Sequence, residues 1–218
     1  FYHEKVRTGR CLVFITPNSE RTMGTYLGAS ERLVFNENFI EAANNSKILF
    51  SEGYQFTSDE NFSAFLNILK STKQKTKLAL SLSDPGVVET FKNRFKEVFK
   101  VRKVDYLFCN KEEATSLVGN NFVKDLGDLA VNFVVTNGAE SSFVVENGSY
   151  AEIKAKNVKA IDSNGAGDIF AGAALNKIIE EESFLNACKF GNYASSKIVQ
   201  EKSPRLSVDQ YKKLKADY

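Results

Sequence analysis

The sequence has few of the residues that hold metal ions and disulfides. Its only histidine is His3, and its three cysteines, Cys11, Cys109 and Cys188, lie far apart in the chain. Cys/His zinc sites need several ligands at close spacing, and a Ser-His-Asp hydrolase needs a histidine outside a solvated chain end, so we expect neither. Three separated cysteines also fit free thiols better than a disulfide framework, and we expect a reducing, cytoplasmic location.

Long apolar runs and an excess of one charge are lacking as well. No segment is apolar over the length that a membrane span requires, and none has the pattern of a signal peptide. The formal net charge is +2, without the basic stripe of a nucleic-acid binder. We therefore expect neither membrane nor nucleic acid as a partner. The 218 residues, 43% of them hydrophobic, suit one globular domain.

Short apolar runs alternate with amphipathic segments along most of the chain. Their periodicity predicts strands over 11–16, 21–27, 47–51, 77–82, 104–108, 131–136, 142–146 and 150–154, the first two and the last two paired as hairpins. Helices are predicted over 39–44, from a cap at Asp59, after Pro85, over 111–118, 168–181 and 183–200, and from a capping box at Ser207 and Gln210. This alternation predicts a mostly parallel sheet with helices on both faces.

Polar residues follow several of the predicted strands at the point where each strand ends. They are Glu52, Asn110 and Thr136, each followed by further polar or glycine residues. Open α/β sheets bind ligands beyond the carboxyl ends of their strands, so we expect these groups to share one edge of the sheet.

The chemistry centres on the segment Asp-Ser-Asn-Gly-Ala-Gly-Asp from Asp162 to Asp168, which leads into an apolar helical run. Glycines allow close approach of the backbone, and a helix that begins here offers the N–H groups of Gly165, Ala166 and Gly167 to an anion. A carboxylate beside a phosphate site has a natural role as the base that takes a proton from an attacking hydroxyl, which assigns Asp168. The alternative is a tight turn with Asp168 as an ordinary first-turn acid.

This segment resembles the second signature of the PfkB (ribokinase-like) kinases, Asp-Thr-x-Gly-Ala-Gly-Asp, with Ser163 at the position where threonine is usual. The resemblance implies a three-layer α/β/α ribokinase-like core and transfer of a phosphoryl group from ATP to an alcohol. It also implies Mg²⁺ and, through the segment 202–205 with Asp162, a monovalent cation such as K⁺. Asp162, Ser163 and Asn164 would lie near the nucleotide phosphates. The implied partner is a small nucleoside or sugar, adenosine first, and the implied state is a monomer or homodimer.

Three further positions resemble motifs of the same family. Asn110-Lys-Glu-Glu113 resembles its Asn-x-x-Glu motif, which implies that Asn110 and Glu113 hold Mg²⁺; helix capping is the alternative. Thr136 and Gly138 match its Thr-x-Gly segment near the phosphates, with a strand-ending turn as the alternative. Asn192 falls in the region that faces adenine in the family, although apolar helices of this kind usually pack in a core.

The segment 8–29 also resembles the family, most of all its bacterial adenosine kinase-type members. Arg21 and Gly28 would lie near the sugar, and a solvated hairpin arginine is the equal alternative. We expect a hairpin beside the substrate at 1–30 and a single nucleotide-binding core at 31–218. The resemblance lacks the family's N-terminal part, with its Gly-Gly-x-x-x-Asn motif and most of the lid sheet, so we expect a truncated fold with an exposed sheet edge.

Two other functions share the same residues. The first is another PfkB sugar kinase, similar to fructokinase or ribokinase and different only in its acceptor. The second is a catalytically inactive, nucleotide-binding fragment that retains the fold. Measurements of binding and turnover separate these possibilities.

Overall fold

The structure is a computed structural model that describes residues 4–15, 21–32 and 36–218. Its main sheet has six strands in the order of the sequence, β3-β4-β5-β6-β7-β8. The first four are parallel, and β7 and β8 are antiparallel to their neighbours. The strands are β3 (Ile48–Glu52), β4 (Lys77–Ser81), β5 (Val104–Asn110), β6 (Ala130–Thr136), β7 (Ser142–Glu146) and β8 (Ser149–Ile153).

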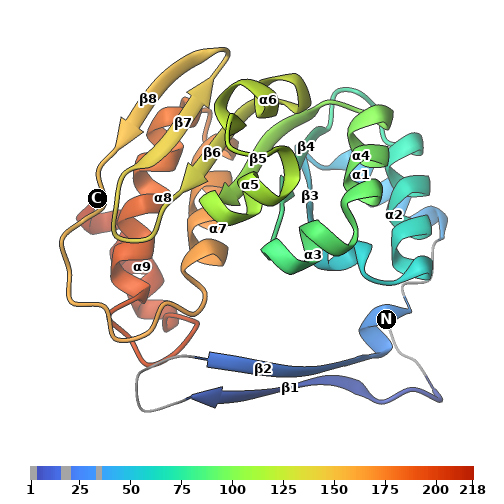
Figure 1. The fold of residues 1–218 in the computed structure, drawn as a ribbon, viewed down its shortest axis with the longest axis horizontal. Coiled ribbons are helices and arrows are strands. Elements are labelled where there is room, and N and C mark those ends of the chain that lie inside the picture. Colours follow the sequence, from blue (N-terminus) through green and yellow to red (C-terminus); the bar gives the residue numbers. More distant parts are fainter. Residues whose placement is uncertain (1–3, 16–20, 33–35) are drawn as a thin grey trace.

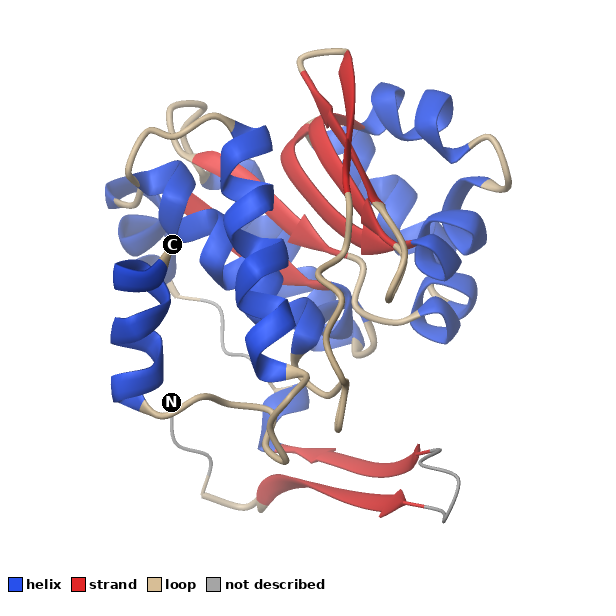
Figure 2. Ribbon diagram, turned by 90° about the vertical axis from the view of Figure 1, so that its left-hand side faces the viewer, coloured by secondary structure: helices blue, strands red, loops and turns tan. Residues whose placement is uncertain are grey.

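Helices cover both faces of this sheet, which confirms the predicted three-layer α/β/α fold (Figure 1). One layer contains α2 (Asp59–Ser71), α3 (Pro85–Thr90), α4 (Lys92–Val101), α5 (Lys111–Val118) and α6 (Phe122–Leu129), and α1 (Glu37–Asn45) packs beside α2. The other layer contains α7 (Ala166–Ile179) and α8 (Phe184–Ile198), with α9 (Val208–Asp217) packed against them. Figure 2 shows the sheet between the two layers.

The strands are apolar on both sides because both sides are covered. In β4, Leu78 and Leu80 are fully buried in the core shared with α2 to α6, whereas Ala79 between them packs in the core shared with α7 and α8. Fully burying a leucine side chain contributes about 1.5–3 kcal/mol to folding. The hydrophobic runs of the sequence therefore account for a sheet with two covered faces.

A two-stranded hairpin lies apart from the main sheet. It is formed by β1 (Thr8–Ile15) and β2 (Arg21–Gly28) and leads into the short 3-10 helix η1 (Ala29–Glu31). Leu12, Phe14 and Tyr26 are each more than half exposed, so the hairpin has no apolar cover among the described residues. The hairpin and the sheet are separate units of structure, and the division at residue 30 into a substrate-side hairpin and a nucleotide-binding core stays a prediction.

The sheet edge at β3 is open in the described part of the chain. β3 pairs with β4 on one side, and Phe50 in β3 is 39% exposed. The lone histidine, His3, lies outside the described residues, and no described helix is long and apolar enough to cross a membrane.

Several helix boundaries differ from the sequence prediction. Ser58, not Asp59, caps α2, because its side chain accepts a hydrogen bond from the Asn61 N–H. The helix predicted after Pro85 is broken at Phe91 into α3 and α4. The eight-residue helix α6 was not predicted, although its sequence is amphipathic and it buries Leu126. The capping box of Ser207 and Gln210 at α9 is confirmed.

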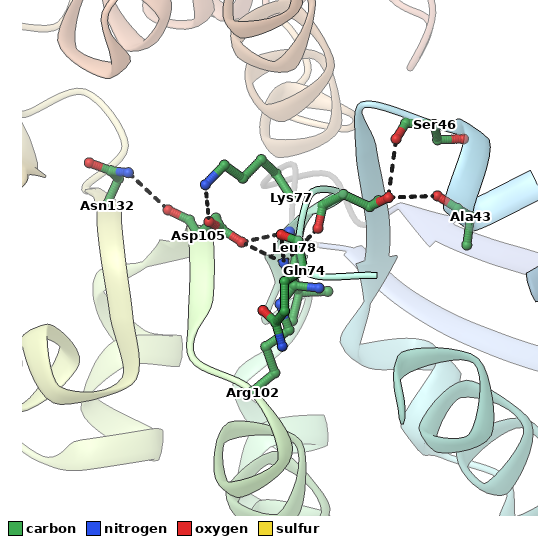
Figure 3. A network of polar contacts seen from close by, with 9 residues as sticks. Ala43, Ser46, Gln74, Lys77, Leu78, Arg102, Asp105 and Asn132 are labelled. Carbon is green, nitrogen blue, oxygen red and sulfur yellow. Dashed lines mark hydrogen bonds and ion pairs between the residues drawn. The ribbon is translucent and has the colours of Figure 1, made fainter. Parts of the chain in front are cut away.

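A polar network stabilises the edge of the sheet at which the parallel strands begin (Figure 3). The Asp105 carboxylate accepts hydrogen bonds from Leu78 N and Lys77 Nζ, each at 2.9 Å, and pairs with Arg102 Nη2 at 3.3 Å. Asn132 Nδ2 donates to the Asp105 carbonyl at 3.0 Å. These contacts tie β4, β5 and β6 together at their amino ends, opposite the edge where ligands of such sheets bind.

Candidate active site

The carboxyl ends of the parallel strands meet at one edge of the sheet, as predicted. Glu52 and Thr136 are the last residues of β3 and β6, and Asn110 ends β5 between them. Asp84 follows β4 and caps α3 by accepting a hydrogen bond from Val87 N at 2.9 Å. The base of the hairpin attaches to the same side of the molecule, because Asn61 at the start of α2 donates to the Ser30 carbonyl.

The glycine-rich segment forms the beginning of α7, two residues earlier than predicted. Gly165 is the N-cap in a left-handed conformation with φ 75°, and no side chain caps the helix. A Cβ atom at Gly165 would lie 2.5 Å from the Pro204 carbonyl oxygen, so both the backbone angle and the space require glycine. This contact places the segment 202–205 directly against the start of α7.

The loop before α7 is fixed to α8 by backbone and side-chain hydrogen bonds. Ile161 N and Asp162 N both donate to the Val199 carbonyl, at 2.6 and 3.1 Å. The Asp162 carboxylate accepts from Asn164 N at 2.9 Å, which closes the turn. Ser195 Oγ donates to the Ala166 carbonyl at 2.8 Å and joins α8 to the first turn of α7. The loop is therefore held in place without a ligand.

The first turn of α7 leaves N–H groups directed away from its own backbone. Ala166 N donates to the Ser163 carbonyl at 3.3 Å, and Ile169 N donates to Gly165 at 2.9 Å. The N–H groups of Gly167 and Asp168 lie between them, in a first turn that has no helical acceptors. Of the predicted anion-binding groups, Gly167 therefore offers a free N–H, whereas that of Ala166 is shared with the loop. The dipole of α7 adds positive potential at the same point.

A pocket of about 250 Å³ opens beside this helix end. It gathers residues from β6, α7, α8 and the loop before α7. Apolar walls come from Phe170, Val199 and neighbouring alanines. Six residues predicted from the sequence to bind nucleotide or phosphate line this one pocket, namely Thr136, Gly138, Ser163, Ala166, Gly167 and Asn192. Asn192 Nδ2 donates to the Lys154 carbonyl at 3.0 Å, which fixes the side chain at the pocket wall.

Asp168 faces a second pocket, of about 540 Å³, on the other side of α7. Glu52, Arg205 and Tyr211 also line it, together with residues along α7 and α9. Burial and, second, the charge of Asp168 raise the pKa of Glu52 above its ordinary value. The two carboxyl groups therefore interact electrostatically, although they lie on β3 and α7, far apart in the sequence. Asp168 therefore lines the second pocket, next in sequence to Gly167, which lines the first.

Asn110 and Glu113 form a reciprocal capping box at α5. Asn110 Oδ1 accepts from Glu113 N at 2.8 Å, and the Glu113 carboxylate accepts from Asn110 N at 3.0 Å and from Asn110 Nδ2 at 2.7 Å. Glu113 is 6% exposed. Burial raises its pKa to about 7, against the lowering effect of the Asn110 N–H, and Asp84 and Glu112 raise it further. Capping, the alternative to a metal role, is therefore present in the structure.

The chemistry of these groups suits a cation held by oxygen atoms, but they do not form a closed cage. Burial raises the pKa of Tyr54, and the charges of Asp84, Glu113, Asp168 and Glu52 raise it further, so four carboxylates lie within electrostatic reach of this tyrosine. Within the described ranges, no three His, Cys, Asp or Glu side chains come together as metal ligands. Mg²⁺ in such sites keeps most of its water and takes few protein ligands besides phosphate oxygens, and the residues present fit that arrangement.

The hairpin residues predicted to bind the sugar are not tied to this site by any described contact. Arg21 begins β2, and its side chain lies outside the described part of the structure. Gly28 ends β2 with φ 57°, and a Cβ atom there would lie 2.3 Å from the Arg7 carbonyl oxygen. The closed base of the hairpin accounts for Gly28. A role of either residue toward a substrate stays a prediction.

Sequence reasoning gave no role to several residues that the fold brings to the site. Ser142 and Ser195 line the pocket beside α7 from β7 and α8. Asp84, which caps α3, also lies at these strand ends. Their types are common and their spacing carries no motif, so only the position of Glu52, at the end of a predicted strand, offered a signal.

Comparison with known proteins identifies the family of the chain. The model of the pfkB family of carbohydrate kinases matches residues 2–210. The chain belongs to this family. An adenosine kinase of Dictyostelium discoideum is 26% identical to it over 227 residues, which are 94% of this chain and 66% of that protein.

Solved structures give the same result for the fold. The crystal structure of adenosine kinase from Sinorhizobium meliloti matches with a TM-score of 0.86 at 26% identity. The match covers 97% of this chain and 66% of the adenosine kinase chain. A ribokinase from Thermotoga maritima, 18% identical with a TM-score of 0.73, shares the fold. This pfkB-family chain spans about two thirds of the length of these relatives, and the predicted ribokinase-like core is confirmed.

Proposed function

We propose that this pfkB-family chain binds ATP and transfers its terminal phosphoryl group to a hydroxyl of a small nucleoside or sugar. One observation carries the proposal: a mostly apolar pocket with six predicted nucleotide-binding residues ends at the uncapped start of α7, beside Asp168. Apolar walls suit a nucleobase, and free N–H groups at a helix start suit phosphate oxygens.

In this reaction Asp168 accepts the proton of the attacking hydroxyl. The hydroxyl oxygen forms a bond to the terminal phosphorus while the bond to the bridging oxygen breaks, and ADP leaves with its negative charge. The Gly167 N–H and the dipole of α7 stabilise the charge that develops on the transferred group, with smaller contributions from Gly165 and Ala166. The exposed position of Asp168 at the mouth of the second pocket leaves its carboxylate accessible to an acceptor.

Mg²⁺ would neutralise phosphate charge and orient the terminal phosphate when it is bound. Asn110 and Glu113 would interact with it through coordinated water, since their side-chain atoms are engaged with each other. Asp162 and Asn164, which close the turn before α7, would lie near the phosphates. A monovalent cation would lie between Asp162 and the segment 202–205, which contacts Gly165.

Adenosine is the first acceptor to test. The support is the name of the relatives at about a quarter identity, several of which are adenosine kinases. The primary hydroxyl is the expected target, and Arg21 and Gly28 of the hairpin are the proposed contacts to the sugar. The acceptor would be a small molecule in each variant of this proposal.

Two measurements on this chain test the proposal. Titration calorimetry with Mg²⁺ and ATP should show binding, and coupled ADP release should show turnover with adenosine above that with ribose or fructose. Turnover with a sugar alone would identify another sugar kinase of the family. Binding of ATP without transfer to any acceptor would contradict the catalytic proposal and leave a nucleotide-binding module. Absence of ATP binding would overturn both.

A further inference from the structure

The pocket beside α7 contains one buried hydroxyl that the protein itself leaves unused. Ser142, the first residue of β7, is 4% exposed and lines the pocket. Within the described residues its side chain makes no hydrogen bond, and its oxygen is not among the buried atoms that lack a partner, so the hydroxyl opens to the pocket. There it is available to water or to a polar group of a ligand.

Three other hydroxyl groups of the same pocket, those of Thr136, Ser195 and Ser196, are directed to backbone carbonyls. Ser195 Oγ donates to Ala166 at 2.8 Å, and Ser196 Oγ donates to Tyr193 at 2.7 Å. Thr136 Oγ1 contacts the Cys109 carbonyl at 3.4 Å. These three hydroxyl groups make hydrogen bonds within the protein, whereas the Ser142 hydroxyl makes none among the described residues.

The strand register directs Ser142 toward this pocket. Val144, two residues further along β7, packs with Val134 of β6 against α7 and α8. Side chains two apart on a strand share a face, so Ser142 projects toward the same two helices. The pairing continues past Val135 and Phe143, which brings Ser142 beside Thr136 at the ends of the two strands. Ser142 therefore lines the pocket beside Thr136, at the ends of β7 and β6.

We propose that the Ser142 hydroxyl binds the nucleotide, at its nucleoside or at one of the two phosphates that remain in ADP. This inference rests on the proposed nucleotide site and assigns it a further binding residue. Asp168 does not line this pocket, whereas Gly167 does, so the transferred phosphate belongs at the α7 end and the rest of the nucleotide within the pocket. Ser142 then contributes equally to ATP and to ADP.

Calorimetry with Mg²⁺·ATP and with ADP on the whole chain tests this assignment. Ser142→Ala should weaken both by about three- to tenfold, the range for one lost hydrogen bond, while the melting temperature without nucleotide stays within about 2 °C. Ser142→Cys, close in size but a weak donor, should match the alanine variant. Ser196→Ala, which removes a committed hydroxyl from the same pocket, should change the affinity by less than about twofold.

The possible results separate this inference from the proposed function. Failure of the wild-type chain to bind ATP or ADP removes the proposed function and the Ser142 contact together. Wild-type binding that Ser142→Ala leaves unchanged removes the Ser142 contact alone. A loss of affinity seen only with a lower melting temperature, or seen for ATP but not for ADP, also overturns it. Wild-type affinity in Ser142→Cys would show that volume, not hydrogen bonding, matters there.

Discussion

The polar groups at the two ends of the parallel strands differ in how completely they are hydrogen-bonded. At the amino ends, the Asp105 carboxylate is surrounded by the N–H groups of Leu78, Lys77 and Arg102 (Figure 3). At the carboxyl ends, the start of α7 has no side-chain cap, and Ser142 has no described partner. Since buried polar groups are nearly always paired, the amino ends serve stability and the carboxyl ends have bonding capacity left for a ligand.

One polar atom at the amino ends of the strands has no partner. Arg102 Nη1 is buried at the amino ends without a partner, although Nη2 of the same side chain bonds to the Gln74 carbonyl and to Asp105. A guanidinium has five N–H groups, and one unused donor does not remove the benefit of the others. The amino ends are therefore still largely paired. We expect substitutions there to change stability, and substitutions at the carboxyl ends to change function.

The largest effect is expected at the carboxyl ends, from Asp168→Asn. If Asp168 is the base, kcat with the acceptor that wild type uses should fall by about 10²–10⁴-fold. Asp168 is exposed, so the melting temperature should stay within about 2 °C and ATP affinity within about threefold. Steady-state kinetics, calorimetry and thermal unfolding measure these three quantities.

A readout that does not depend on turnover accompanies this variant. The charge of Asp168 is one cause of the raised pKa of Glu52, so Asp168→Asn should lower that pKa toward its ordinary value in an NMR titration. Retained turnover would remove Asp168 as the base, and an unchanged Glu52 pKa would show that the two side chains do not face the same pocket.

At the amino ends the expected effect is on stability. Asp105→Asn leaves Arg102, whose side chain is 8% exposed, without its counter-charge, and this should cost about 3 kcal/mol in urea unfolding. Lys77→Ala, which removes the half-exposed partner of the same carboxylate, should cost less than about 1 kcal/mol. ATP affinity should be unchanged in both. Loss of affinity without loss of stability would contradict the division between the two ends.

Two glycines of one segment sharpen the comparison within the site. Gly165→Ala meets a left-handed backbone and the Pro204 carbonyl, and should destabilise the fold by about 2 kcal/mol. Gly167 has open space around a Cβ position and an ordinary helical place, so Gly167→Ala should leave the free energy of unfolding within about 0.5 kcal/mol. The new methyl group would lie in the pocket that we propose for the nucleotide, and should weaken ATP binding. Equal stability of the two variants in urea unfolding would refute this difference.

The sequence was informative where the determinants are local. Apolar runs and glycine punctuation predicted the strands of the main sheet and the position of α7, because neighbouring residues alone decide them. The break at Phe91 has no proline or glycine to mark it in the local sequence, whereas the short helix α6 is amphipathic and was missed because it is only eight residues long. The committed hydroxyl of Ser195 and the unused one of Ser142 have the same chemistry in sequence. Only the fold distinguishes them.

Asn110 and Glu113 illustrate a different limit. The same two residue types, at the same spacing, serve as a capping box and as ligands for Mg²⁺, and both uses begin a helix after a strand. The sequence pattern identifies the pair but does not distinguish a capping box from a pair of Mg²⁺ ligands. The structure shows the capping contacts, and the raised pKa of Glu113 shows that this pairing does not fully offset the cost of burying the carboxylate.

The smallest expected effect is a pH dependence of stability caused by Glu113, without nucleotide or Mg²⁺. Its folded pKa, about 7, lies above the ordinary 4.5, so the folded state favours the protonated acid. The stability that Glu113 contributes is therefore complete below pH 4.5 and is lost as the pH rises through about 7. Glu113→Gln removes this dependence, and between pH 5 and pH 8 its stability relative to wild type should rise on the order of 2 kcal/mol.

The substituted amide also loses one of the two hydrogen bonds that the carboxylate accepts from Asn110, which costs about 1 kcal/mol at every pH. Glu113→Gln should therefore be less stable than wild type at pH 5 and more stable at pH 8, a reversal that urea unfolding at the two pH values measures. Glu112→Gln, on the exposed side of the same helix turn, is the matched control and should show no reversal. If the difference in free energy of unfolding between wild type and Glu113→Gln is the same at both pH values, the pKa of Glu113 is not raised. Its hydrogen bonds would then fully offset the cost of burial, as those of Asp105 do at the amino ends of the strands.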